Sequence, residues 1–280
     1  MKVTMCYPEG RKKAVTLSYD DGVAQDVRLI KIMEQNGLKG TFNLNAGNLP
    51  LEDAVDKGKL SKRQIIELYS NSGQEVAAHG YHHPTLNGLP AANITADILL
   101  DRMGLEKMFG KIIRGLAYPN GSYSDEVVDC LHACGIVYAR TVISTESFEL
   151  PSDWLRLPAT CHHNNPRLFE LTEEFVSTPR RPSDRCWMFY LWGHSYEFDR
   201  DNNWERIEEF AKKIGRHEDI WYATNIEIYE YIEAYRQIRY NVEGTLAYNP
   251  TQKDIWIIVN RDTLLCIKAG ETVQLPDFVE

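Results

Sequence analysis

Three short segments of this 280-residue sequence, which read YDDG, HGYHHP and WGHS, carry aspartates and histidines that could do acid–base or metal chemistry. The first segment supplies the adjacent carboxylates Asp20 and Asp21. The second supplies His79 and His83, and the third supplies His194. Two imidazoles and one carboxylate, with positions left open for water, are a common ligand set for zinc or a similar divalent ion. The types alone therefore indicate a catalytic metal centre.

The local positions of these residues favour divided roles. Asp20 and Asp21 follow an apolar run that predicts a strand, so their side chains should point to opposite faces. One carboxylate can then bind a metal while the other acts as a base. Gly80 and Pro84 favour a strand end and a turn around the histidines, and a turn can bring both rings to one point. Taken singly, an Asp-Asp-Gly is usually a turn and a loop histidine is often only solvated. The hypothesis depends on all the segments occurring together.

The elements that must position these residues alternate between strands and helices. Apolar β-rich runs predict strands at 13–22, 38–45, 74–80, 112–121, 136–142, 154–163, 186–195 and 219–225. Helical spacing predicts helices at 23–37, 61–73, 93–110, 124–135, 166–176, 203–215 and 226–238. Such alternation is typical of a parallel sheet, and about seven units predict an α/β barrel whose active site lies at the carboxyl ends of the strands.

The tail of the chain differs in character. Short apolar runs there are separated by turn residues and predict small strands. We therefore expect a barrel over residues 1–238 and a small β extension over residues 239–280, packed on the barrel.

Composition excludes several function classes. The formal net charge of −9 and the lack of a basic stripe argue against a nucleic-acid partner. No stretch approaches 18 consecutive apolar residues, and the N-terminus lacks the apolar core of a signal peptide, so we expect no membrane association. We expect a cytoplasmic location, with a secreted protein whose leader has been removed as the alternative. The six cysteines form no C-x-x-C pair, which favours reduced thiols.

Together these segments resemble the polysaccharide deacetylase family, the nodulation-type chitooligosaccharide deacetylase domain among the carbohydrate esterases. LSYDDG and HGYHHPTL resemble its first two motifs, LAYPNGSYSDEV its third and FYLWGHSYEF its last, and the similarity covers roughly residues 14–235. The resemblance implies a deformed (β/α) barrel of about seven parallel strands. It also implies metal-dependent removal of acetyl groups from an N-acetylated carbohydrate.

Carried over position by position, the resemblance assigns roles to the five residues. Asp20 is the general base, and His194 is the general acid that protonates the leaving amine. Asp21, His79 and His83 hold one divalent metal ion, with zinc favoured over cobalt, nickel or iron.

The resemblance also assigns the residues around the substrate. A backbone N–H near Asn120 would stabilise the oxyanion, with Tyr118 and Pro119 beside it. Leu191 and Trp192 would help to form the acetyl pocket.

The chain departs from the family pattern in two motifs. Many relatives carry an arginine in the third motif, where this chain has LAYPNG, so Arg140 is the candidate to orient the base. Asp153 and Trp154 match the fourth motif only in part. His162 and His163, which follow them, could support the site from behind, bind substrate or lie in a polar loop. His82 matches no ligand position.

Other functions stay open at this point. The same site could act on an O-acetyl sugar or on a small non-sugar amide. A non-catalytic carbohydrate-binding barrel is a further alternative, which the intact set of acidic and histidine residues contradicts. The oligomeric state is not predicted.

Overall fold

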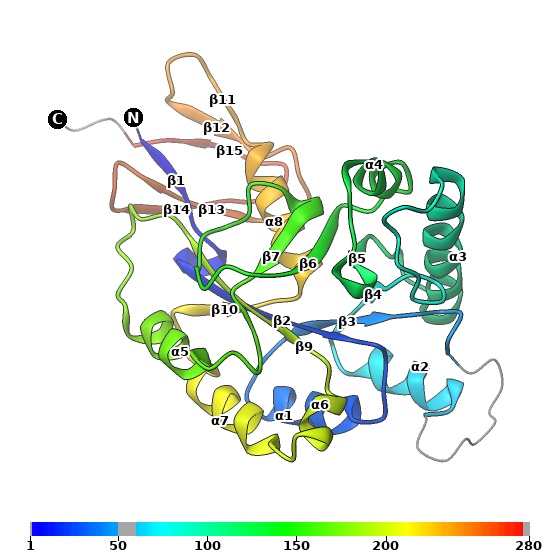
Figure 1. The fold of residues 1–280 in the computed structure, drawn as a ribbon. Helices are drawn as coiled ribbons and strands as arrows, with labels where there is room; N and C mark the ends of the chain where they lie inside the picture. Colours follow the sequence, from blue (N-terminus) through cyan, green and yellow to red (C-terminus); the bar gives the residue numbers. More distant parts are fainter. Residues whose placement is uncertain (1, 50–59, 277–280) are drawn as a thin grey trace.

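The computed structural model describes residues 2–49 and 60–276 and shows an α/β barrel (Figure 1). Its main sheet is parallel, with the strand order β7-β6-β5-β4-β3-β2-β9-β8. These strands are β2 (Lys13–Asp20), β3 (Gly40–Leu44), β4 (Glu75–Ala78), β5 (Gly115–Ala117), β6 (Tyr138–Ser144), β7 (Leu157–Ala159), β8 (Cys161–His162) and β9 (Trp187–Gly193).

One segment closes the sheet into a barrel. β7 and β8 are consecutive and separated only by Thr160; β7 pairs with β6, whereas β8 pairs with β9. The N–H of Thr160 donates to the carbonyl of Tyr190 at 2.9 Å, which continues the second pairing. Counted as one strand, β7 and β8 complete a closed barrel of seven parallel strands, so the predicted fold class is confirmed.

The barrel is deformed beside β2. The first half of β2 pairs with β10 (Ile220–Tyr222), and its second half pairs with β3. β3 therefore reaches only the carboxyl half of β2, which is the half that ends in Asp20.

Seven of the helices follow strands of the barrel, as expected (Figure 1). They are α1 (Asp26–Gln35), α2 (Lys62–Asn71), α3 (Ala91–Phe109), α4 (Asp125–Ala133), α5 (Leu168–Ser177), α7 (Trp204–Ile214) and α8 (Asn225–Arg236). The short helix α6 (Tyr196–Arg200), directly after His194, was not predicted. Ser61 and Ser124 cap α2 and α4 through their side chains, as their positions in the sequence indicate.

Alternation along β2 separates an apolar face from a polar one. Leu17 and Tyr19 belong to the buried cluster that also contains residues of α1 and α7. The intervening side chains face the barrel interior, where Ser18 accepts a hydrogen bond from Asn43 Nδ2 and Thr16 donates to Asn225 Oδ1, both at 2.8 Å. Asp20 is the next residue on this interior face, so the strand itself directs its carboxylate into the mouth of the barrel.

The tail forms two small antiparallel sheets. One has the order β1-β13-β14 and the other the order β11-β12-β15. Their strands are β1 (Val3–Met5), β11 (Arg239–Tyr240), β12 (Leu246–Tyr248), β13 (Ile255–Val259), β14 (Thr263–Ile267) and β15 (Thr272–Gln274). β1 was not predicted, and it joins the sheet of the tail from the other end of the sequence. The expected extension also includes residues 277–280, which lie outside the described residues.

The tail packs against α8. Tyr231 of α8 donates its hydroxyl hydrogen to the carbonyl of Cys6 and accepts the N–H of Trp256, both at 2.9 Å. Ile255 and Ile257 are fully buried in the same apolar cluster. All six cysteines are free thiols. Within the described ranges, no helix combines the length and the apolarity needed to cross a membrane.

Candidate active site

The carboxyl ends of β2, β4 and β9 bring four of the five predicted residues together. Asp20 Oδ2 lies 3.7 Å from Nε2 of His79 and 3.7 Å from Nε2 of His194. Asp21 Oδ1 lies 3.8 Å from the same nitrogen of His79. Asp21 has a φ of 78°, a conformation that a residue with a side chain rarely adopts, and this turn at the end of the strand aims it at His79.

His79, His83 and Asp21 have the geometry of a metal-binding group. Their candidate ligand atoms all lie within 4.8 Å of one another, and the two imidazole rings are 4.6 Å apart. His79 Nδ1 lies 2.8 Å from the carbonyl oxygen of Ala117, which can only accept a hydrogen bond, so Nδ1 carries the hydrogen. Nε2 then presents a lone pair. This buried atom has no hydrogen-bond partner among the described residues, so its lone pair is available to a metal ion.

The backbone of the turn after His79 is held by side chains of α3, which accept its N–H groups. Asp101, which is fully buried, accepts the N–H of His79 at 2.8 Å and the N–H of Ala46 at 2.7 Å. Asp97 accepts the N–H of Tyr81 at 3.0 Å. These bonds fix the backbone of the segment, and the left-handed φ of 58° at His83 turns the chain back so that the second imidazole reaches the first.

Two partners hold the carboxylate of Asp20. The guanidinium of Arg140 lies 2.5 Å from Oδ2, and Nδ2 of Asn43 donates to Oδ1 at 2.8 Å. Burial alone would raise the pKa of Asp20, but the positive charge of Arg140, helped by His79 and His194, outweighs it and holds that pKa below its usual range. The structure thus brings Arg140, the predicted partner of the base, to the carboxylate of Asp20.

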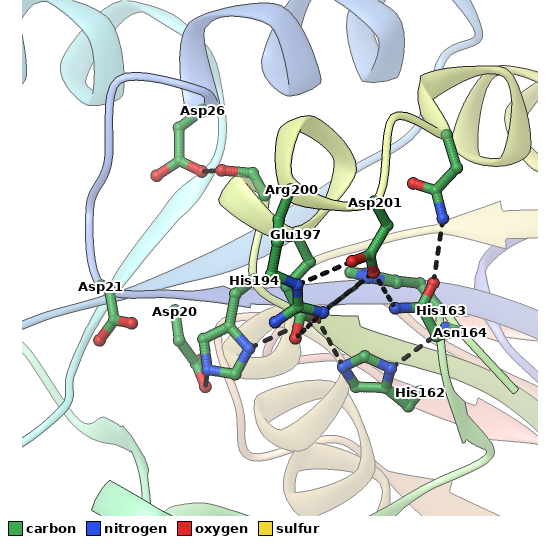
Figure 2. Close-up of polar contacts among 12 residues, drawn as sticks. Asp20, Asp21, Asp26, His162, His163, Asn164, His194, Glu197, Arg200 and Asp201 are labelled. Atoms are coloured by element: carbon green, nitrogen blue, oxygen red, sulfur yellow. Dashed lines mark hydrogen bonds and ion pairs between the residues drawn. The ribbon is translucent and has the colours of Figure 1, made fainter. Parts of the chain in front are cut away.

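His194 lies between two carboxylates (Figure 2). Its Nε2 faces Asp20, and its Nδ1 lies 3.7 Å from Oε2 of Glu197 on α6. Burial lowers the pKa of His194, but the contacts with Glu197 and Asp20 outweigh burial and raise it overall. A raised pKa keeps the ring protonated to higher pH, which suits a proton donor.

The predicted substrate residues divide into two groups. Trp192 packs its ring 4.4 Å from the guanidinium of Arg140 and 5.9 Å from the ring of His194, so it forms a wall of the site. Asn120, in the 3-10 helix η2 (Pro119–Gly121), is exposed, and its N–H has no acceptor among the described residues. An added side chain at Gly80 would lie 2.9 Å from Pro119, so this loop lies against the segment that bears His79.

Two of the predicted substrate residues are placed elsewhere. Leu191 lies on the opposite face of β9 from Trp192 and is fully buried in the cluster between barrel and helices, so the prediction that it lines an acetyl pocket was wrong. Tyr118 is also buried; its hydroxyl donates to the carbonyl of Leu155 at 2.7 Å and its N–H to that of Arg140 at 3.0 Å. Both of its donors are therefore used within the fold.

The two residues of the partial fourth motif and the two histidines that follow them lie in different surroundings. Asp153 accepts the N–H of Leu155 at 2.8 Å at the start of the 3-10 helix η3 (Trp154–Arg156), and Trp154 packs on Tyr229 of α8, so both serve packing. His162 and His163 are not in a solvated loop, because both ring Nε2 atoms lie 3.1 Å from Oε2 of Glu197 (Figure 2).

Sequence reasoning missed two residues that shape the site, Asn43 and Asp101. Asp101 did carry a signal, because it falls in the apolar stripe of α3 with Ile94, Ile98 and Leu105, where an aspartate without a partner would be costly. Asn43 has no comparable signal, since its role depends on neighbours that the tertiary fold supplies.

Comparisons with known proteins agree with this geometry. Residues 8–139 match the family model described as polysaccharide deacetylase. A candidate polysaccharide deacetylase from Mycobacterium smegmatis is 19% identical, with a TM-score of 0.61 over 83% of this chain and 94% of that one. The Xyl-CE4 domain of a multidomain xylanase, from the hindgut metagenome of Trinervitermes trinervoides, is 15% identical, with a TM-score of 0.50 over 80% and 92% of the two chains.

At these identities the structural likeness concerns the fold. No curated protein sequence matches the chain. The matched family model spans β2 to β5, and thus includes both the aspartate pair and the histidine turn. By this match, residues 8–139 of the chain are similar to the polysaccharide deacetylase family.

Proposed function

We propose that the protein is a metal-dependent hydrolase that removes acetyl groups from an N-acetylated carbohydrate. One observation carries the proposal. Asp20 and His194, a carboxylate held ionised and an imidazole with a raised pKa, lie 3.7 Å apart beside a histidine whose ligand atom is buried and unpartnered. A base, an acid and a candidate metal group thus converge at one mouth of the barrel.

Asp21, His79 and His83 would hold one divalent ion. Two imidazoles and one carboxylate suit zinc, and cobalt, nickel or iron also accept this set. Such an ion, when bound, polarises an acyl carbonyl and lowers the pKa of a bound water. The tautomer of His79 supports this assignment, because its Nδ1 hydrogen is held by the carbonyl of Ala117.

The protein's own groups would move the protons. Asp20 accepts a proton from the attacking water, whose oxygen bonds to the acyl carbon. The N–H of Asn120 would donate to the oxygen of that acyl group as negative charge develops there. As the C–N bond breaks, Nε2 of His194 donates its proton to the departing nitrogen, and the products are acetate and a free amine. Trp192, packed on Arg140, would exclude water from one side.

The test is acetate release by the metal-loaded protein from chitooligosaccharides, acetyl-xylan and small N-acyl amides. We expect release from the N-acetylated sugars, and a loss of about 10²–10⁴-fold in kcat for Asp20→Asn and for His194→Ala. Metal content should stay near that of the wild type in Asp20→Asn. Asp129→Asn, an exposed site on α4, is the control.

Three outcomes would contradict the proposal. Cleavage of only an O-acetyl sugar or only a small amide would reassign the substrate. Binding of oligosaccharides without turnover of any substrate would indicate a carbohydrate-binding barrel. Unchanged turnover in both variants would remove Asp20 and His194 from the chemistry.

A further inference from the structure

A second group of two histidines and one carboxylate lies behind His194. His162 and His163, at the end of the closing segment of the barrel, place both Nε2 atoms 3.1 Å from Oε2 of Glu197. Nδ1 of His194 lies 3.7 Å from the same oxygen, and Arg200 lies 3.4 Å from Oε1 (Figure 2). By ligand types and spacing this group could hold a metal ion, just as Asp21, His79 and His83 could.

The hydrogen on each imidazole distinguishes the two groups. Nδ1 of His79 faces a carbonyl oxygen, so Nε2 has the bare lone pair that a metal needs. Nδ1 of His162 instead lies 3.1 Å from the backbone nitrogen of Asn164, which can only donate. Nδ1 of His162 is therefore the acceptor, and the ring hydrogen is on Nε2, the atom that lies 3.1 Å from Oε2 of Glu197. An imidazole with its hydrogen on Nε2 donates there and cannot ligate a metal there.

The other members of the group agree with this assignment. His163 is fully buried, and burial, only partly offset by Glu197, lowers its pKa to about 4, so it is neutral. Burial alone would raise the pKa of Glu197, but the donors on His162, His163 and His194 outweigh it and hold that pKa far below its usual range. Glu197 is thus a buried carboxylate whose Oε2 has three ring nitrogens within 3.7 Å.

We propose that Glu197, held by His162 and His163, is a positioning residue for His194, and that this cluster carries hydrogens rather than a second metal ion. The inference rests on the proposed function, in which His194 is the acid. Glu197 would accept the Nδ1 hydrogen of His194, which leaves Nε2 as the atom that faces Asp20 and the reacting nitrogen. The 3.7 Å separation is longer than a hydrogen bond, and catalytic hydrogen bonds commonly tighten only when substrate is bound.

Several titratable or charged groups lie around His194 on the elements packed near it. They are Asp20 and Asp21 after β2, His162 and His163 on the closing segment, and Tyr196, Glu197, Arg200 and Asp201 in and after α6. Figure 2 shows the ring of His194 between Asp20 and Glu197, so the two carboxylates act on opposite nitrogens.

The test begins with Glu197→Gln, which keeps the shape of the side chain and removes its charge. In NMR titrations of the metal-loaded protein with labelled histidine rings, we expect the pKa of His194 to fall by about one to three pH units. The upper limb of the pH profile of kcat should move to lower pH in step, and kcat at neutral pH should fall by about 10²–10⁴-fold with KM retained. Glu173→Gln, an exposed site on α5, is the control.

His162→Ala gives an independent readout, since His162 is partly exposed and its removal leaves the carboxylate in place. Oε2 then loses one of the donors that compete with His194, so the pKa of His194 should rise rather than fall. His162→Gln, which restores an N–H donor, should return it toward the wild type. Elemental analysis after zinc loading should give the same metal content in all three variants as in the wild type.

Two results would overturn the inference: an unchanged titration of His194 in Glu197→Gln, or loss of one equivalent of zinc in His162→Ala. Failure of the proposed function is distinguishable, because it would appear as an inactive wild type or as an active His194→Ala. In that case the NMR titration and the metal content, which need no substrate, still decide whether Glu197 positions the ring.

Discussion

Replacing Arg140 by Met should strongly destabilise the protein, because it leaves the carboxylate of Asp20 buried without its counter-charge. The two side chains are only 1% and 3% exposed and lie 2.5 Å apart. Asn43 remains as a neutral donor to the same carboxylate. Removing one member of a buried ion pair typically costs about 3–5 kcal/mol, and we expect a loss in the free energy of unfolding within this range.

The magnitude is tested best by a double-mutant cycle. Asp20→Asn leaves the guanidinium of Arg140 buried, where Nε and Nη1 already lack hydrogen-bond partners among the described residues. Replacing both members removes both charges, and in buried pairs this double change often alters the free energy of unfolding only slightly. The double variant should therefore be more stable than the sum of the single changes predicts, by at least about 2 kcal/mol.

The assay is urea unfolding of the chelator-treated protein at one pH, since a bound cation would compensate part of the missing charge. The slopes with urea should agree among the variants, so that differences in midpoint report stability. Arg28 and Glu208, an ion pair 2.8 Å apart whose side chains are 52% and 37% exposed, form the control cycle, with a coupling below about 1 kcal/mol. If the Arg140 and Asp20 changes prove additive, the reasoning that the pair is a coupled buried unit is refuted.

Two further predictions concern buried aspartates. Burial, partly offset by hydrogen bonds from Ser195 and Tyr69, raises the pKa of Asp26 to about 7, so its contribution to stability is complete below about pH 4 and is lost as the pH rises through about 7. In urea unfolding, the wild type should lose about 4 kcal/mol in the free energy of unfolding over this pH window, and Asp26→Asn should not. An equal decline in both proteins would contradict the prediction. Asp101→Ala should weaken zinc affinity by about 10–100-fold in a chelator competition, because the N–H of His79 loses its acceptor; unchanged affinity would show that the turn holds itself.

Most of the helices and strands could be predicted from local sequence patterns. Each predicted helix overlaps an observed one, and Ser61 and Ser124 mark the starts of α2 and α4 because a side-chain cap is a local property. β1 was missed because three residues are too few to show a period. Closure of the barrel could not be predicted either. The partners of residues 157–162 change within one segment, and nothing in its sequence says which strand each half will meet.

The residues of the site likewise divide into those that the local sequence locates and those that only the tertiary fold places. Asp20, Asp21, His79 and His194 lie next to strand ends and could be located from the sequence, since parallel strands bring their carboxyl ends to one mouth. Leu191 shows the limit of that reasoning, because the choice between it and Trp192 depends on which face of β9 points inward. Glu197 acquires its place only when α6 folds back toward the segment that closes the barrel.

The pairing of β2 with β9 has a consequence for how the protein folds. β2, which ends in the aspartate pair, is an early segment of the chain, yet Lys13–Tyr19 pairs with Trp187–Gly193. The entropy of closing so long a loop must be offset before the contact forms, which makes this pairing a slow step. Until then one edge of the most buried strand is open to other chains. Catalytic activity should therefore appear late in refolding. Refolding at high protein concentration should favour aggregation through this edge.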